Sequence, residues 1–281
     1  MFWKRLFSGV ILLAIAIITM AVGGPLLAGV LYIVSLIAFR ELTAATKCNG
    51  GEKSFSWLER IGLAGVSAYY VACYFAAGME KGGIILFAVI MGVFLLELFA
   101  YVVAFPKFKT EQISMVFFAF LYAPVMLAFT YLARALQGGQ YIVWLILISA
   151  WGCDTCAYVV GMLIGKKKIF PHLSPKKSLE GCFGGVLGAM LIGALYARFF
   201  VTVRFQEKPV VLVITIICGV GAVMSMIGDL VASAIKRDHD IKDYGKLIPG
   251  HGGIMDRFDS IIITAPLVYF LAYFMLEQRL I

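Results

Sequence analysis

Two aspartates near the end of the chain have the type and spacing that bind a divalent cation. Asp256 and Asp259 lie three residues apart in the stretch GHGGIMDRFD (250–259), so at a helix start both carboxylates point to one side. Their like charges repel, and a cation such as Mg²⁺, which takes one or two carboxylates plus phosphate oxygens and water, removes the repulsion. The spacing predicts magnesium-assisted phosphate chemistry, although helix capping alone explains either aspartate taken singly.

The residues around these aspartates suit a phosphate. Gly252 and Gly253 let the backbone approach a phosphate closely, with amides at a helix N-terminus aimed at it. His251 is expected near the phosphate or as a hydrogen-bonding residue, because the histidines of the chain show no metal-ligand spacing. Arg257 is a further candidate for substrate binding, although it points away from the two aspartates.

A polar stripe runs along the apolar segment that precedes this stretch. Helical spacing places four side chains on one face, at i, i+4, i+8 and i+11: Ser225, Asp229, Ser233 and Lys236. An ionised carboxylate in hydrocarbon is costly and normally faces a cavity or a partner. We interpret the stripe, with Arg237 directly after it, as part of a site; the alternative is a hydrogen-bonded helix contact with a snorkelling lysine.

A second stripe lies in an earlier apolar segment. Its members occupy one helix face, again by spacing: Asp154, Tyr158, Gly161 and Gly165. Small residues on such a face usually mean close helix approach. Asp154 at the head of the stripe and a basic loop at its foot leave open that this face borders the same cavity.

The basic loop itself is a candidate for phosphate binding. The segment SPKKS (174–178) offers Ser174, Lys176 and Lys177 in what we expect to be a tight turn suited to a polyphosphate. Cytoplasmic loops of membrane proteins often contain Lys-Lys, so the pair alone is weak evidence.

The composition places these residues in a membrane protein. The 281-residue chain is 62% hydrophobic and 14% charged, with a mean hydropathy of +0.95, whereas soluble domains are about one quarter charged. Apolar runs long enough to cross a bilayer recur along it. They predict an all-α integral membrane fold with about nine transmembrane helices: 6–23, 24–40, 61–79, 82–105, 112–134, 140–163, 183–203, 208–235 and 257–276.

Charge sets the orientation of these spans, because Lys and Arg concentrate in cytoplasmic loops. With the N-terminus inside, 18 of the 24 basic residues fall on the cytoplasmic side, including both basic loops of the second half. The net charge of +8 is thus mostly a topology signal and not evidence of nucleic-acid binding. We expect one integral domain, with N-terminal transmembrane helices in 1–135, a C-terminal catalytic region in 136–281, and an active site at the cytoplasmic membrane interface.

Two further features bear on function. Most of the six cysteines lie in or beside apolar spans and read as packing residues; Cys153 and Cys156 form a C-x-x-C, but a zinc site needs two more ligands. Glu97, inside a span, is expected to be a buried hydrogen-bonded carboxylate or a conformational element.

The assembled motifs resemble those of one enzyme family. The stretch SAIKRDHDIKDYGKLIPGHGGIMDRFD (233–259) is closely similar to the signature of phosphatidate cytidylyltransferases, or CDP-diacylglycerol synthases: S-x-x-K-R, K-D, P-G-H-G-G and D-R-x-D. DTCAYVVG (154–161), SPKKSLEG (174–181) and the Gly-Asp at 228–229 also look like the family's upstream features. The match covers about the last 130 residues, and Cys156 stands where small residues are usual.

The resemblance implies that CTP and phosphatidate react to CDP-diacylglycerol and pyrophosphate at the cytoplasmic face of a bacterial inner membrane. It also implies a homodimer and two cations, one of them Mg²⁺, held by Asp229, Asp256 and Asp259. The residue chemistry fits, because two polyanions must meet, and each pair of unit charges at 4 Å repels by about 1 kcal/mol in water and about 4 kcal/mol at an interface. We expect Ser233, Lys236, Arg237 and the 252–253 backbone to hold phosphates, and Lys176 and Lys177 to close over the nucleotide.

Two other functions remain open at this point. A CTP-dependent polyprenol or phytol kinase shares the multi-span plan and the nucleotide, but it phosphorylates an alcohol and releases CDP. A non-enzymatic transporter would line its path with the intramembrane carboxylates Asp154, Asp229 and Glu97.

Overall fold

The computed structural model describes residues 2–48, 56–171, 173–202, 210–248, 250 and 252–276. It is built of helices, with one small hairpin, and it divides into two compact units. The first unit comprises residues 1–132 and 239–257, and the second comprises residues 133–238 and 258–281. That the region 136–281 carries the catalytic residues and the region 1–135 does not stays a prediction.

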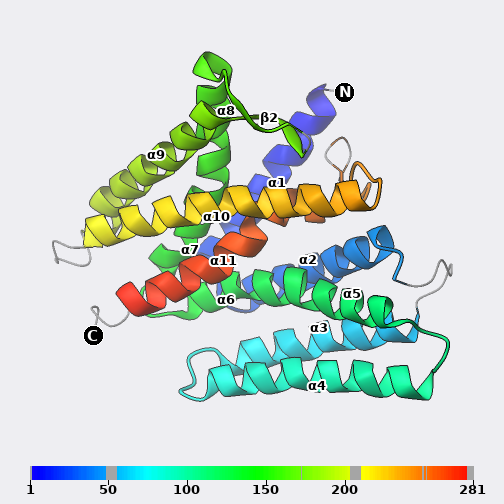
Figure 1. The fold of residues 1–281 in the computed structure, drawn as a ribbon. Helices are drawn as coiled ribbons and strands as arrows, with labels where there is room; N and C mark the ends of the chain where they lie inside the picture. The colour runs from blue at the N-terminus through cyan, green and yellow to red at the C-terminus, as the bar shows by residue number, and fades with distance from the viewer. Residues whose placement is uncertain are drawn as a thin grey trace. The chain divides into compact units, whose positions relative to one another are not determined.

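The first unit contains the N-terminal helices. Their bounds are α1 Phe2–Val22, α2 Gly24–Ala45, α3 Trp57–Ala76, α4 Gly82–Val103, α5 Thr110–Phe120, a π-helical turn η1 Leu121–Val125, and most of α6 Met126–Ala135. In Figure 1, α3 and α4 run side by side as an antiparallel pair. Glycines allow these helices to approach closely, since a Cβ at Gly65 would lie 2.6 Å from a methyl group of Val93 on α4.

The second unit contains the remaining elements. They are α7 Gly139–Leu147, a π-helical turn η2 Ile148–Gly152, α8 Cys153–Ile164, β1 Lys168–Phe170, β2 Ser174–Ser178, α9 Leu179–Tyr196, η3 Ala197–Val201 and α10 Val210–Asp238. Helix α11, Met255–Met275, begins in the first unit and continues into the second at Phe258.

The helices confirm a multi-pass membrane protein. Seven of those described are long and apolar enough to cross a membrane, and each coincides with a predicted span. The predicted spans 6–23 and 61–79 correspond to α1 and α3, which are not among the seven. For α1 the described apolar part is the shorter helix Phe7–Val22, and α3 begins at Trp57 and therefore includes Glu59 and Arg60.

The segment SPKKS is a strand and not the tight turn that we expected. It forms β2, which pairs with β1 in antiparallel register, Lys168 opposite Ser178 and Phe170 opposite Ser174. Ser178 ends the strand and caps α9, its Oγ accepting a hydrogen bond from the amide of Gly181 at 3.2 Å. The local sequence looked like a turn because its residues favour turns, whereas pairing with residues 168–170 decides the conformation.

Small residues hold α9 against its neighbours. A Cβ at Gly185 would lie 2.9 Å from Cys153 Sγ and from Ala157 Cβ, both on α8, and Gly188 lies against Cys156. All six cysteines are free thiols, and burial raises the pKa of Cys48, in the connection after α2, to about 11. Cys48, Cys73, Cys153 and Cys218 are buried, which agrees with the predicted packing role of most cysteines.

This close approach predicts that Gly185→Ala destabilises the protein. The added methyl group meets a backbone oxygen of Cys153 at 3.0 Å, so we expect a loss of about 1–3 kcal/mol from overpacking. Gly92→Ala on α4 is the control, because its Cβ meets nothing within 4 Å and alanine favours a helix. Thermal unfolding of the purified proteins in detergent measures both; equal midpoints would contradict the packing described here.

Candidate active site

Three carboxylates of the second unit come together from three helices. Asp154 lies on α8, Asp229 on α10 and Asp259 on α11, and the charge of Asp229 acts on both of the others. Ser260 connects two of them: its Oγ donates to Asp154 Oδ2 at 3.4 Å and its amide donates to Asp259 Oδ1 at 2.8 Å. We call Asp154, Asp229 and Asp259 the carboxylate cluster.

A glycine makes this cluster possible. A Cβ at Gly228 would lie 2.7 Å from the carbonyl oxygen of Asp259, so only glycine lets α10 and α11 approach at this level. The neighbouring residue, Asp229, is thereby placed beside Asp259. The pair Gly-Asp at 228–229 thus combines a packing residue with a functional candidate.

Lys177 partly neutralises the carboxylate cluster. Its Nζ lies 2.6 Å from Asp229 Oδ2, with 20% of the lysine side chain and 30% of the aspartate side chain exposed. Nζ also donates to the carbonyl oxygen of Met226 at 3.5 Å. The strand β2 therefore delivers a cation to the cluster, a contact that local spacing did not reveal.

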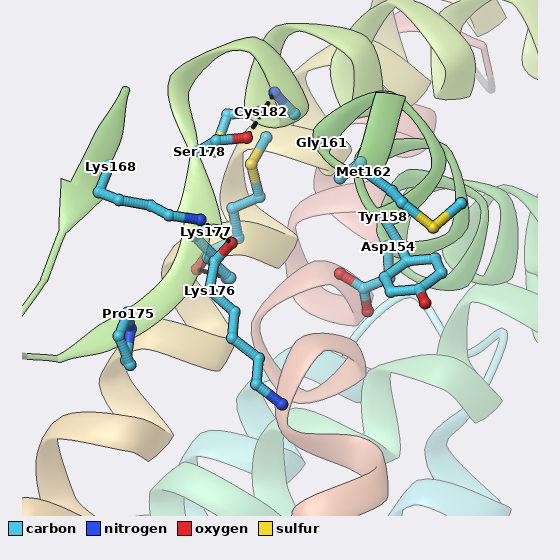
Figure 2. Close-up of a pocket in the computed structure, with 13 residues that line it drawn as sticks. Asp154, Tyr158, Gly161, Met162, Lys168, Pro175, Lys176, Lys177, Ser178 and Cys182 are labelled. Carbon is cyan, nitrogen blue, oxygen red and sulfur yellow. Dashed lines mark hydrogen bonds between the residues drawn. The ribbon is translucent and has the colours of Figure 1, made fainter. Parts of the chain in front are cut away.

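A cavity of about 430 Å³ opens beside the cluster (Figure 2). Asp154, Tyr158 and Gly161 of α8 line one side, and Lys176 and Lys177 of β2 line the other. The walls also include apolar side chains, those of Met162, Pro175, Cys182 and Met226. The stripe on α8 and the basic segment thus border one cavity, which offers lysines for an anion and apolar walls for a hydrophobic part of a ligand.

The four residues of the predicted polar stripe all lie on the single helix α10, as predicted, and they become more exposed toward its C-terminal end. Ser225 is fully buried, and its Oγ has no hydrogen-bond partner among the described residues. Ser233 and Lys236 are half-buried, Arg237 is exposed, and the charge of Lys236 acts on Asp259. The cationic end of α10 therefore belongs to the surroundings of the carboxylate cluster.

Ser174, the first residue of β2, is half-buried.

In the first unit, the Asp256 carboxylate binds backbone amides. Its Oδ2 accepts hydrogen bonds from the amides of Tyr244, at 2.9 Å, and Gly253, at 3.0 Å, and the side chain is only 8% exposed. The amide of Gly253, which we expected to face a phosphate, thus donates to Asp256. Gly252 has a φ of 84°, the left-handed region that favours glycine.

The remaining candidates are only partly placed. Arg257 is exposed. His251 lies outside the described residues. The predicted roles of all these side chains stay predictions.

Sequence reasoning missed Glu41. The predicted span 24–40 ends one residue before Glu41, and none of the predicted motifs includes this residue. Its carboxylate nevertheless accepts hydrogen bonds from the amides of Ile254, at 3.1 Å, and Met255, at 2.8 Å. A carboxylate beside Arg40 at the end of an apolar span was the only local sign.

Glu97 is buried, as predicted, but its predicted hydrogen bond is not found. It is 0% exposed, and neither carboxylate oxygen has a partner within the part of the chain that the structure describes.

The carboxylate cluster has oxygen ligands of the kind that Mg²⁺ prefers, but its side chains are not arranged around a common metal position. Its carboxylate and hydroxyl oxygens suit Mg²⁺, which takes oxygen ligands. Among the described residues, no group of three or more His, Cys, Asp or Glu side chains is arranged to hold a metal ion. One oxygen of Asp229 is already bound to Lys177.

The chain is similar to known proteins over nearly its whole length. Residues 3–275 match the model of the cytidylyltransferase family. A phosphatidate cytidylyltransferase of Bacillus subtilis is 35% identical over 198 residues, which cover 70% of each chain. Another, of Staphylococcus haemolyticus, is 30% identical over 268 residues, covering 94% of this chain and 96% of that protein. A third, of Synechocystis, is 38% identical over 138 residues, 49% of this chain and 45% of that one.

The ion pair in the cluster predicts that Lys177→Met destabilises the protein in metal-free buffer. Without the lysine, three neighbouring carboxylates repel one another, and we expect a loss of about 1–3 kcal/mol, between the values for exposed and buried pairs. Lys176→Met is the matched control, because this exposed neighbour makes no ion pair with a described residue. Thermal midpoints in detergent compare the variants; a Lys177→Met midpoint equal to that of the control would argue against the pairing.

Proposed function

The chain belongs to the cytidylyltransferase family, and we propose that it transfers the cytidylyl group of CTP to phosphatidate, forming CDP-diacylglycerol and pyrophosphate. The observation that carries the proposal is the carboxylate cluster with Lys177 beside a cavity that combines lysines and apolar walls. A nucleotide needs cations, and a lipid phosphate needs both a cation and an apolar surface.

The reaction needs charge neutralisation more than a strong base. A phosphate oxygen of phosphatidate bonds to the α-phosphorus of CTP, and the bond from that phosphorus to the bridging oxygen breaks, releasing pyrophosphate. The attacking phosphate is already ionised, so positioning and electrostatic stabilisation do most of the work. Bound Mg²⁺ would supply part of the positive charge.

The proposed roles assign cations to the aspartates and phosphates to the lysines, arginine and serine around them. Asp229 and Asp259 would hold the cations, with Asp154 beside them and with Asp256 as the further predicted ligand. Lys236, Ser233 and Arg237 at the end of α10 would bind phosphates. On the other side of the cavity, Lys176 and Lys177 would bind the nucleotide, which requires Lys177 to release Asp229.

The membrane topology is part of the proposal. We infer nine spans, with α1 and α3 added to the seven long apolar helices, and a cytoplasmic N-terminus. The distribution of basic residues supports this orientation. It puts the active site at the cytoplasmic face of the membrane, which we expect to be a bacterial inner membrane. A homodimer remains the expectation from the family resemblance.

The two alternatives are not favoured. The family match and the names of the relatives point to cytidylyl transfer and not to phosphorylation of an alcohol. A transporter path would give no reason for lysines to line a cavity beside the carboxylates.

Purified protein should convert CTP and phosphatidate to CDP-diacylglycerol in the presence of Mg²⁺, with one pyrophosphate released per lipid product. Thin-layer chromatography of the lipid and an assay of pyrophosphate measure the two products. Release of CDP with a phosphorylated polyprenol would indicate the kinase instead. No product with either Mg²⁺ or Mn²⁺ would contradict the proposal.

The role of Asp259 as a cation ligand is tested by Asp259→Asn. Asparagine keeps an acceptor for the Ser260 amide, so we expect the variant to fold while kcat falls about 100-fold or more. Asp238→Asn, an exposed position at the end of α10, is the control and should retain activity. Asp256→Asn is a less clean test, because Asp256 also holds two backbone amides. Wild-type kcat in Asp259→Asn would exclude it from the cation site.

A further inference from the structure

Glu41 binds the start of α11 from the far end of the sequence. Its two carboxylate oxygens take the amides of Ile254 and Met255 separately, Oε1 at 3.1 Å and Oε2 at 2.8 Å. These residues are 213 and 214 positions away in the chain, and all of them belong to the first unit. The first amides of a helix have no partner within the helix, so a carboxylate there satisfies two of them at once.

Two glycines make room for this carboxylate. A Cβ at Gly245 or at Gly253 would collide with the carboxylate of Glu41. Neither glycine has a positive φ in the structure, so the need for glycine at both positions comes from space and not from backbone conformation. The glycine that the sequence suggested for phosphate approach, Gly253, is thus explained by contact with Glu41.

Glu41 and Asp256 divide three consecutive amides between them. Gly253 donates to Asp256, whereas Ile254 and Met255 donate to Glu41. Asp256 also accepts a hydrogen bond from the amide of Tyr244, so it ties Tyr244 to the turn that Glu41 holds. The two like charges lie close enough to repel, and the helix N-terminus with its amides offsets that cost.

We propose that Glu41 is a positioning residue for the reaction: by binding the Ile254 and Met255 amides it fixes the first turn of α11, and with it the carboxylate of Asp256. The inference rests on the proposed function, in which Asp256 is a cation ligand. Residues that orient a ligand from behind typically contribute about 10- to 100-fold to metal affinity or activity. Glu41 touches neither substrate nor cation in this role.

Glu41→Gln is the most direct test, because it keeps the size of the side chain but replaces one acceptor oxygen with a donor. Hydrogen exchange, followed by mass spectrometry on the peptide that covers residues 252–257, should show faster exchange of the Ile254 and Met255 amides than in wild type. The exposed Glu80→Gln, in the turn before α4, is the matched control and should exchange as wild type. Unchanged protection in Glu41→Gln would overturn the proposal.

The kinetic test separates positioning from a purely structural role. We expect the Mg²⁺ concentration for half-maximal activity to rise, and kcat at ordinary Mg²⁺ to fall, by about 10- to 100-fold in Glu41→Gln, with partial recovery at high Mg²⁺. Gly245→Ala, whose added methyl group would collide with the same carboxylate, should behave alike. Wild-type Mg²⁺ dependence in both variants, with activity lost only in proportion to unfolded protein, would overturn the proposal.

The exchange experiment does not depend on turnover. If the wild-type protein formed no CDP-diacylglycerol, the proposed function would fail, and hydrogen exchange would still decide whether Glu41 holds this turn.

Discussion

An ionised carboxylate among apolar helices is costly unless a cation or a row of amides faces it, and this cost shapes one polar cluster in each unit. In the second unit, Lys177 binds Asp229 at 2.6 Å and its charge also acts on Asp154. The charge of Lys236 acts on the third aspartate, Asp259. In the first unit, Glu41 and Asp256 are held by backbone amides at a helix start. A flexible lysine can leave a carboxylate when another cation binds, whereas the amides of a folded turn hold a carboxylate in a fixed position.

Small residues permit these arrangements. Gly228 brings α10 against the backbone of Asp259, and Gly185 brings α9 against Cys153 on α8. In a membrane, helices gain little from burying apolar surface against one another, so close backbone approach supplies much of the packing. The same contacts that stabilise the second unit therefore set the spacing of its carboxylates.

The hairpin β1–β2 and the apolar helix α8 line the same cavity. The hairpin carries Lys168, Lys176 and Lys177 to one rim, and α8 supplies Asp154 and Tyr158 to the other. Tyr158 is 70% exposed, so a large aromatic side chain is available to a ligand. In the proposed reaction, the lysines would bind the charged nucleotide and the apolar walls would contact the lipid.

The sequence by itself determined the helical membrane class, seven of the spans, the stripe on α10 and the family, because hydropathy, helical spacing and motifs are local properties of the chain. Only the tertiary structure decided that SPKKS is a strand, that Lys177 pairs with Asp229, and that Glu41 holds the start of α11. Each of these depends on partners brought together by folding, in the case of Glu41 from 213 residues away. The spacing of residues along the sequence determines which side chains share a helix face, but it does not determine which distant amides or charged groups that face contacts.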